Sequence, residues 1–515
     1  MAALRWLATR VWFWPVLLTA ALGLWRIGRP ELWRDELRSW SAVSRPFGDL
    51  LHLLGNTDAA VALYYLLLYP WIRLFGDSAV SMRLPSLIAM AGAAACVGLI
   101  GQRLYSKRVG VVAGLLFAVI PAVTRFSQEV RPYAITMLLV CVSTLLLLRT
   151  LERPTRWRWF GYALSIAGVG LAQVVALPVL AAHAVGVLLW PRLARSGSQT
   201  QRGPRSRIQP ASGARARTGT AVSRPLRVWL VWAAVGLVMA APVLLLSMSQ
   251  YGHQVGSLPD ATLGELTLLP ARLFSSAAVA GVIIALCLLA FARKVVPALF
   301  LAAWAVLPIG IVWVVSNLGQ SYWMTRYLLP TLPAFALLAG AAVTVVANLR
   351  VAALVLVAVM ALGYHDHQGV RSVGSHDAWN YPESYHEPLL YSRAAELIAT
   401  NQQPGDGIMY VARDDYWLLD IGLAYHLRGQ PQPADVMVRE TALQRGDFWV
   451  AECDQPAECV GDAPRIWLVA ASVAYGTGIA TLDPETRRFL ETRYDVAERF
   501  AVSGISVVLW ERDLN

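Results

Sequence analysis

The feature that most constrains this chain is a succession of long apolar segments in residues 1–365. Each segment is long enough to cross about 30 Å of hydrocarbon as a helix that rises about 1.5 Å per residue. Charged residues form only 15% of the chain, below the roughly 25% of soluble globular domains. The sequence therefore predicts an α-helical polytopic membrane protein with about eleven transmembrane helices, near residues 11–27, 84–104, 109–124, 132–150, 159–173, 175–190, 228–248, 272–292, 296–317, 326–346 and 350–364.

Basic residues in the short loops predict which side of the membrane each loop faces. Arg5 and Arg10 place the N-terminus in the cytoplasm, because cytoplasmic loops are rich in Lys and Arg. The same rule assigns to the cytoplasm the later basic loops at residues 103–108, 149–158, 293–294 and 350. An odd number of spans then places the C-terminus outside. This loop bias also accounts for the net charge of +11, so we expect no nucleic-acid partner.

Two further features indicate a bacterial plasma membrane. Lys107 and Lys294 are the only lysines among 44 Lys and Arg residues, a usage typical of GC-rich bacterial genomes. The first apolar segment, 11–27, lacks a small-residue cleavage site, so we interpret it as a first span and not as a signal peptide.

The composition divides the chain into a transmembrane domain, 1–365, and a C-terminal domain, 366–515. Within the first, residues 191–227 contain nine arginines and no acid, which predicts a disordered cytoplasmic loop attracted to anionic membrane lipid. The second alternates an amphipathic helical pattern with short β-rich runs, which predicts a small extracytoplasmic α/β domain. The expected elements are a helix at 391–400 and strands at 407–411, 465–469 and 503–511.

The five cysteines fall into two groups. Cys96, Cys141 and Cys287 lie in predicted spans, where a packing role is expected. Cys453 and Cys459 lie in the C-terminal domain, where an oxidising compartment allows a disulfide. Two unlinked thiols are the alternative.

Three separate segments bring ionisable and aromatic residues to the predicted outer face: residues 33–40, 125–133 and 321–327. Ionisable groups at such depth are costly and tend to be functional, although each segment could instead pair its own charges at i,i+4. A carboxylate here can deprotonate a hydroxyl, and nearby arginines can bind a phosphate and stabilise it as a leaving group. The pattern therefore favours sugar transfer from a lipid phosphate. Motifs for ATP hydrolysis, zinc proteolysis and serine hydrolysis are absent from the sequence.

The ordered motifs resemble the GT-C glycosyltransferases, in the branch of protein O-mannosyltransferases and aminoarabinose transferases. The chain is most similar to actinobacterial mannosyltransferase-like membrane proteins. The similarity covers roughly the first 345 residues and is carried by the Asp35-Glu36 pair and by residues 62–67, 75–78, 83–86, 127–129, 131–133 and 326–330. It implies a polyprenyl-phosphate-linked sugar as donor and an inverting transfer. The transfer would be independent of metal or loosely assisted by a divalent metal ion.

The resemblance also implies roles for individual residues. Asp35 corresponds to the catalytic base, with Glu36 beside it, and Glu129 occupies the second acidic position. Arg131 and Arg326 correspond to ligands of the carrier phosphate. Aromatic and polar residues of the matched segments are expected to line the substrate: Trp33, Asp58, Tyr64, Tyr65, Gln128, Tyr133 and Tyr327.

One segment departs from the family pattern. Many relatives have His-Pro-Pro before the Leu-Tyr-Tyr motif, but here Asp58-Ala59-Ala60-Val61 occupies that place. Asp58 could act as a polar contact in place of the histidine, or it could cap the following helix. We interpret residues 46–83 as interfacial helices, because counting 61–75 as a span would reverse the sidedness of all later loops.

The leading hypothesis is a membrane glycosyltransferase that moves a sugar, with mannose favoured, to a glycan, lipid or protein acceptor. A transporter or flippase of lipid-linked glycans is an alternative, although such proteins favour internal repeats and midplane charges that the sequence lacks. A non-catalytic envelope assembly protein is a third. Mannose, arabinose and galactose all remain open as the sugar.

Overall fold

The computed structural model divides the chain into two compact units. The helical unit comprises Met1–Trp25, Ala59–Tyr64 and Arg83–Val370, and the mixed unit comprises Arg26–Asp58, Tyr65–Met82 and Arg371–Asn515. The structure describes residues 6–7, 9–198, 220–250, 258, 260–292, 294–346, 349–372, 388–413 and 417–513.

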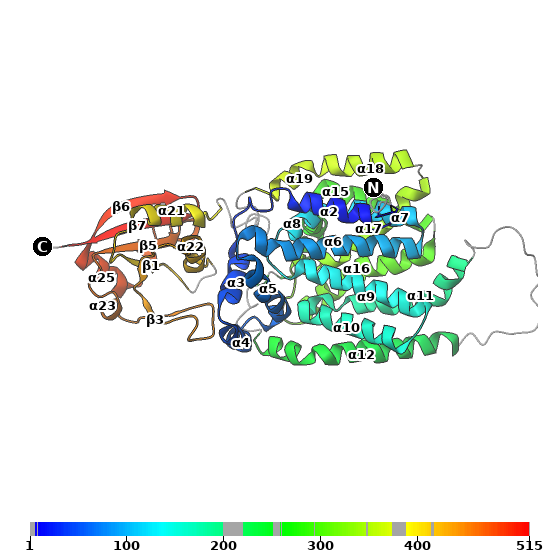
Figure 1. Cartoon of the computed structure of the whole chain (residues 1–515), viewed down its shortest axis with the longest axis horizontal. Coiled ribbons are helices and arrows are strands. Elements are labelled where there is room, and N and C mark those ends of the chain that lie inside the picture. The colour runs from blue at the N-terminus through cyan, green and yellow to red at the C-terminus, as the bar shows by residue number, and fades with distance from the viewer. Residues whose placement is uncertain are drawn as a thin grey trace, which may run out of the picture. The chain divides into compact units, whose positions relative to one another are not determined.

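Long helices dominate the helical unit, and several of them run side by side (Figure 1). Five are long and apolar enough to cross a membrane: Ala79–Leu104 (α6), Tyr133–Glu152 (α9), Val174–Leu193, which runs from the short 3-10 turn before α11 into α11 (Val179–Ser198), Arg224–Ser249 in α12 and Val295–Leu318 (α16). Two bent pairs raise this number to seven if each is one span: Lys107–Ala118 (α7) with Pro121–Ser127 (α8), and Leu263–Phe274 (α14) with Ala277–Ala292, which contains α15. The predicted polytopic helical class is confirmed.

Shorter helices occupy the other four predicted spans. They are Phe13–Leu24 (α2), Arg156–Ala172 (α10), Leu332–Val346 (α17) and Leu349–Leu362 (α18). The predicted span 326–346 starts too early, because two short 3-10 turns, Thr325–Tyr327 (η4) and Leu329–Thr331 (η5), precede α17. Every predicted span therefore coincides with helix, although length and composition alone support five to seven crossings.

Two predicted spans are interrupted. In 272–292, α14 ends at Ser275, whose positive φ of 51° leaves the helical region. Ser276 then caps α15 by accepting a hydrogen bond from the Val279 N–H, and the two axes differ by 97°. In 109–124, Pro121 starts a new helix at 67° to α7. Proline cannot donate the backbone hydrogen bond that would continue the first helix.

The predicted disordered loop at 191–227 is wrong at both ends. Residues 191–198 continue α11 (Val179–Ser198), and residues 220–227 begin α12 (Thr220–Ser249). Helices extend past the apolar core here because their first and last turns need no membrane burial. Residues 199–219 lie outside the described part of the chain.

Close helix packing depends on small residues. A Cβ atom added at Gly340 in α17 would lie 2.7 Å from the Ala113 Cα atom in α7, and one at Gly101 in α6 would lie 2.8 Å from the Gly110 Cα atom. Small residues allow helix backbones to approach closely in membranes, where packing replaces the hydrophobic effect between helices.

The mixed unit contains the predicted α/β fold, with five strands in the order β2-β1-β5-β7-β6. β1 is parallel to β2 and β5, whereas β5, β7 and β6 pair antiparallel. The strands are Gly407–Tyr410 (β1), Ala434–Asp435 (β2), Arg465–Ala471 (β5), Tyr494–Val502 (β6) and Ile505–Arg512 (β7), with a separate pair Val438–Glu440 (β3) and Ala451–Glu452 (β4). The helices are Arg34–Ser44 (α3), Phe47–Asn56 (α4), Tyr391–Asn401 (α21), Leu419–Leu427 (α22), Pro456–Cys459 (α23), Ser472–Tyr475 (α24) and Pro484–Arg493 (α25); Ala62–Phe75 (α5) crosses the unit boundary.

The predicted helix at 391–400 and the three predicted strands are present as α21, β1, β5 and β7. The sequence analysis missed β6, which lies at the sheet edge. Its charged residues Asp495, Glu498 and Arg499 are exposed, and its register shifts between Val496 and Glu498. A solvated edge strand with a bulge lacks the regular apolar alternation that marks a strand.

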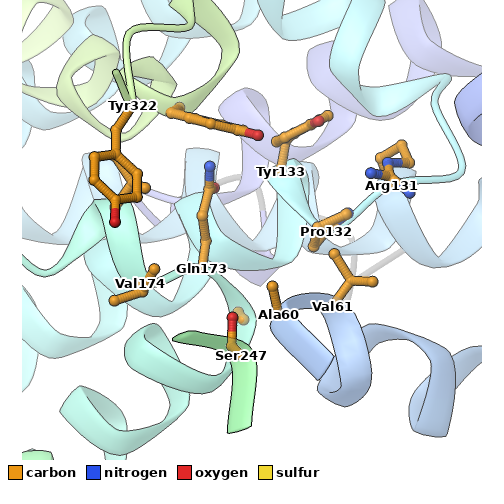
Figure 2. Close-up of a pocket in the computed structure, with 12 residues that line it drawn as sticks. Ala60, Val61, Arg131, Pro132, Tyr133, Gln173, Val174, Ser247 and Tyr322 are labelled. Atoms are coloured by element: carbon orange, nitrogen blue, oxygen red, sulfur yellow. The ribbon is translucent and has the colours of Figure 1, made fainter. Parts of the chain in front are cut away.

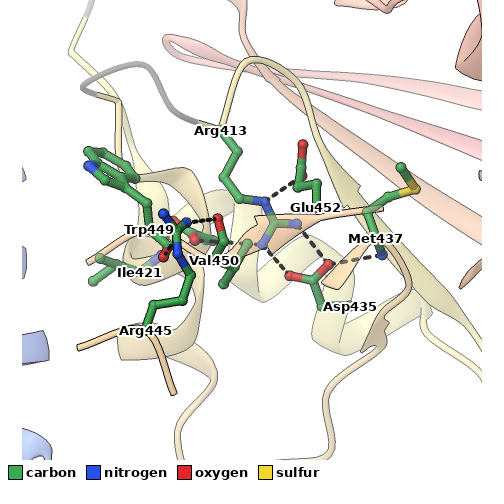
Figure 3. A network of polar contacts seen from close by, with 9 residues as sticks. Arg413, Ile421, Asp435, Met437, Arg445, Trp449, Val450 and Glu452 are labelled. Carbon is green, nitrogen blue, oxygen red and sulfur yellow. Dashed lines mark hydrogen bonds and ion pairs between the residues drawn. The ribbon is translucent and has the colours of Figure 1, made fainter. Parts of the chain in front are cut away.

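A buried arginine joins several elements of this domain (Figure 3). Both terminal nitrogens of Arg413 donate to the carboxylate of Asp435, at 2.5 and 2.7 Å. Its Nε lies 2.8 Å from the Glu452 carboxylate. Because β2 ends at Asp435 and β4 at Glu452, this arginine links the larger sheet to the smaller one. The structure also joins Cys453 and Cys459 by a disulfide bond.

A buried carboxylate fixes the start of β1. Asp406 accepts hydrogen bonds from Arg465 at 2.7 and 2.9 Å, from the Trp467 indole at 2.8 Å and from the Gln403 N–H at 2.9 Å. Burial acts to raise the pKa of Asp406, but these hydrogen bonds outweigh it and hold the pKa below its ordinary value.

Asp406→Asn should lower the free energy of unfolding of the mixed unit by about 3 kcal/mol at neutral pH, because it removes the nearer and more buried of the two carboxylates that face Arg465; the other, Glu511, lies 3.9 Å away. A lower thermal midpoint of tryptophan fluorescence in detergent would show this. Because folding lowers the pKa of Asp406, its contribution to the free energy of unfolding is fully present above about pH 3.8, the ordinary pKa of the group. That contribution is lost as the pH falls through the lower pKa of the folded protein. Asp454→Asn, at a side chain that is 88% exposed, is the control and should leave the midpoint unchanged. Equal midpoints for Asp406→Asn and wild type would contradict this prediction.

Candidate functional site

The polar residues of the helical unit gather where its helices are interrupted. Residues 128–132 separate α8 from α9, Gln173 separates α10 from the 3-10 turn Val174–Ala176 (η2), and η4 and η5 precede α17. Irregular backbone is tolerated at membrane depth only where protein or a water-filled cavity satisfies its polar groups. Such interruptions are therefore the places where a membrane protein can hold a polar site.

Hydrogen bonds fix the first interruption. The Gln128 side chain donates to the backbone carbonyls of Gly23 and Trp25, at 2.8 and 3.0 Å. The Ser86 hydroxyl donates to the Glu129 carbonyl at 2.6 Å. The Gln128 side chain thus binds the backbone at the end of α2, and the Glu129 backbone is bound by a side chain of α6.

A charged cluster lies next to this loop. Arg125, Glu129 and Arg326 are all buried. Arg125 is attracted electrostatically by Glu129 and repelled by Arg326, so these three buried groups lie within electrostatic range of one another. Guanidinium groups gathered in this way form strong charge-assisted hydrogen bonds with phosphate or carboxylate groups.

Aromatic rings flank the same cluster. The Arg326 guanidinium lies 5.9 Å from the centroid of the Tyr133 ring, within the range of a cation–π contact. The Tyr133 and Tyr327 ring centroids are 6.5 Å apart. These contacts bring the start of α9 and the turn before α17 together.

A partly open pocket lies beside these rings (Figure 2). Its polar lining residues are Arg131, Tyr133, Gln173, Ser247, Tyr322 and Tyr327, and apolar residues from 60–61, 172–175 and Pro132 complete its walls. Arg131 lies on one side of the pocket and Tyr322 with Val174 on the other. A half-buried arginine and an aromatic wall together can bind a phosphorylated organic group.

Gln173 and Ser247 are pocket residues that the sequence analysis missed. Both lie within or beside apolar segments, where a single polar residue is usually a packed one. The signal that could have found Gln173 is its place between two apolar runs that are each short for a crossing, which marks an interrupted helix.

In the mixed unit, Asp35 and Glu36 are fully buried in the first turn of α3. The Glu36 carboxylate accepts a hydrogen bond from the Trp33 N–H at 3.3 Å, so it satisfies one of the backbone donors at the start of this helix. Negative charge in a first turn also favours the helix dipole. Trp33, Asp35 and Glu36 are therefore held by local helix structure.

Asp58 has side-chain partners in the same unit. Its carboxylate accepts a hydrogen bond from the Tyr65 hydroxyl at 2.8 Å and lies 3.3 Å from the Arg38 Nε. Its backbone adopts a left-handed conformation with φ of 58°, which Asp tolerates better than most residues. These contacts join α3 to α5.

A loop of the C-terminal region accepts hydrogen bonds from the segment that carries Asp35. Arg45 donates to the carbonyls of Ala442 and Asp447, at 3.4 and 2.6 Å. Asn56 donates to the carbonyls at positions 445 and 446, each at 3.3 Å. The Arg38 guanidinium lies 4.4 Å from the Phe448 ring centroid. We call residues 441–448 the clasp loop.

The predicted site residues thus fall into two groups. Tyr64, Gln128, Glu129, Arg131, Tyr133, Arg326 and Tyr327 belong to the helical unit, and Trp33, Asp35, Glu36, Asp58 and Tyr65 belong to the mixed unit. Within the described residues, no group of three or more His, Cys, Asp or Glu gathers as metal ligands would. Whether a divalent metal ion assists remains an open prediction.

Solved structures decide the fold. ArnT from Cupriavidus metallidurans in the apo state matches with a TM-score of 0.60 at 15% identity, over 99% of this chain and 98% of ArnT. The same protein bound to undecaprenyl phosphate matches with a TM-score of 0.59 at 14% identity, over 96% and 97%. This chain has the GT-C fold. The resemblance seen in the sequence is confirmed at that level.

Two further comparisons concern the sequence. The profile of the family described as dolichyl-phosphate-mannose-protein mannosyltransferase matches residues 58–203 of this GT-C chain. That range includes Glu129, Arg131 and Gln173 but not Asp35 or Arg326. No curated protein matches the sequence significantly.

Replacing both Arg45 and Asn56 by Ala should loosen the clasp loop from the segment that bears Asp35. Because a hydrogen bond from a charged group contributes about 1.5–3 kcal/mol, amide hydrogen exchange in residues 34–44 and 441–448 should speed up by about tenfold or more. Mass spectrometry of the exchanged protein measures this. Arg439→Ala is the control, since Arg439 is exposed and pairs only with exposed Asp454 among its described ion-pair partners. Unchanged exchange in residues 34–44 of the double variant would count against the clasp.

Proposed function

We propose that this GT-C chain is a membrane glycosyltransferase that moves a sugar, with mannose favoured, from a polyprenyl-phosphate carrier to an acceptor. The observation that carries the proposal is the pocket of the helical unit, which is lined by Arg131 and three tyrosines and has the buried Arg326 against the Tyr133 ring. The match of its fold to ArnT, which has been crystallised with undecaprenyl phosphate, supports a lipid phosphate as ligand.

In this proposal, Arg131 and Arg326 bind the phosphate that links sugar to lipid. Guanidinium groups form paired hydrogen bonds with phosphate oxygens and keep their charge at any physiological pH. They also stabilise the negative charge that develops when the phosphate leaves. Tyr133, Tyr322 and Tyr327 offer flat faces for the sugar ring or the first isoprene units.

Asp35 acts as general base. It removes the proton of an acceptor hydroxyl, the hydroxyl oxygen attacks the anomeric carbon, and the polyprenyl phosphate leaves with the electron pair of the broken bond. One displacement of this kind inverts the anomeric configuration. Glu36, bound to the Trp33 N–H, orients the first turn of α3, and Glu129 balances the arginines as second acid.

We place the protein in a bacterial plasma membrane, with residues 366–515 outside the cytoplasm. The loop charges of the sequence support this orientation, and the Cys453–Cys459 disulfide is compatible with an oxidising compartment. The acceptor is a glycan, a lipid or a protein of the cell envelope. Charged residues at helix interruptions, rather than along the midplane, favour transfer over transport.

Asp35→Asn should reduce sugar transfer by at least about 100-fold, because an amide cannot take the proton of the acceptor. The assay follows label from polyprenyl-phosphate [14C]mannose, and from the galactose and arabinose equivalents, into membrane acceptors. Asp49→Asn, in the neighbouring helix α4, is the control and should retain activity. Wild-type transfer by Asp35→Asn would exclude Asp35 as the base.

Arg131→Ala and Arg326→Ala should each weaken the binding of undecaprenyl phosphate by about 10–100-fold, since each removes a charge-assisted hydrogen bond. Arg131→Lys should recover only part of the affinity, because lysine cannot form the paired contact. Binding is measured with the purified protein in nanodiscs. Arg350→Ala, at an exposed arginine, is the matched control. Undiminished affinity in both alanine variants would refute the phosphate assignment.

A further inference from the structure

The backbone of Gln173 is satisfied although the helix stops there. Its N–H donates to the Val169 carbonyl at 2.9 Å, and its own carbonyl accepts from the Ala176 N–H at 3.0 Å. The residue has an extended conformation, with φ of −167° and ψ of 108°. The turn therefore does not need the side chain of Gln173 to complete its hydrogen bonds.

The side chain of Gln173 is nevertheless buried, and no described residue forms a hydrogen bond with it. The residue is only 7% exposed, and neither its Oε1 nor its Nε2 atom has a hydrogen-bond partner among the described residues. Buried amides are almost always hydrogen-bonded, and leaving one unpaired costs stability. A polar group kept at such a cost indicates a partner that binds from outside the chain.

Two other buried glutamines of the helical unit show the contrast. Gln250 accepts a hydrogen bond from the Ala59 N–H at 2.9 Å, and Gln128 donates to two carbonyls. Both are held by the protein itself. Gln173 instead extends into the pocket, where its amide ends between Tyr322 and Tyr133 (Figure 2).

The layout of the pocket indicates what this amide meets. Arg131 stands on one side, and Gln173 lies toward the side of Tyr322 and Val174. When the phosphate of a glycosyl phosphate contacts Arg131, a sugar that extends into the pocket comes within reach of the Gln173 amide. A sugar hydroxyl both donates and accepts hydrogen bonds, which matches the paired donor and acceptor of an amide.

We propose that Gln173, with the neighbouring hydroxyl of Ser247, recognises hydroxyl groups of the donor sugar and sets which sugar the pocket accepts. This inference rests on the proposed function and deepens it, because it separates recognition of the sugar from recognition of the phosphate. A site built to hydrogen-bond a hydroxyl discriminates strongly against analogues that lack it, since its buried polar groups then stay unpaired.

The binding test compares four lipids on the full-length protein in nanodiscs: undecaprenyl phosphate and its mannosyl, galactosyl and arabinosyl derivatives. Wild type should bind at least one glycosylated lipid about tenfold more tightly than undecaprenyl phosphate. In Gln173→Leu this preference should fall to within about twofold, while the affinity for undecaprenyl phosphate stays unchanged. Gln173→Met, which keeps an unbranched side chain, should behave in the same way.

A stability measurement separates recognition from a structural role. Because the Gln173 side chain has no hydrogen-bond partner among the described residues, Gln173→Leu should keep or raise the thermal midpoint of the unliganded protein. Gln250→Leu is the matched control, and it should lower the midpoint, since it strips the Ala59 N–H of its acceptor, yet keep the lipid preference.

Three outcomes would overturn the inference. They are a full sugar preference in Gln173→Leu, a lowered midpoint in Gln173→Leu, and no preference for any glycosylated lipid in wild type. Failure of wild type to bind any of the four lipids would instead overturn the proposed function itself.

Discussion

The structure of the helical unit depends on one constraint, the need to satisfy every backbone polar group in an apolar surrounding. Helices meet this need along their length, so polar chemistry is confined to their interruptions. The loop at 128–132, the break at Gln173 and the turns at 325–331 supply half of the polar pocket lining, namely Arg131, Gln173 and Tyr327. The helix interruptions that the fold contains are therefore also the places where polar residues can line a pocket.

Electrostatics decides what such a pocket can hold. Arg125, Glu129 and Arg326 are buried within electrostatic range of one another, and Arg131 follows Glu129 closely in sequence. Hydrogen bonds from Gln128 and Ser86 fix the backbone beside them. Guanidinium groups gathered at one place are suited to hydrogen-bond a phosphate more strongly than a neutral ligand.

The mixed unit shows a different principle, the support of one segment by a distant one. The segment with Asp35 is clasped by residues 441–448, through Arg45, Asn56 and Arg38. Neither of the two segments carries a recognisable sequence motif, because the hydrogen bonds from Arg45 and Asn56 end on backbone carbonyls, which every residue has. Sequence patterns could therefore predict the α/β domain from its apolar periodicity. They could not predict that residues 441–448 contact the segment that carries Asp35.

By itself, the sequence determined the helical membrane class and the position of nearly every helix, because hydropathy and loop charge are local properties. Motif order led to the prediction of the site residues Asp35, Glu129, Arg131 and Arg326. Only the tertiary structure decided where helices bend, as at Ser275, and which residues meet across them. It placed Gln173 in the pocket and grouped the cluster around Glu129. Such meetings arise from contacts between segments far apart in the chain, and one-dimensional patterns do not carry that information.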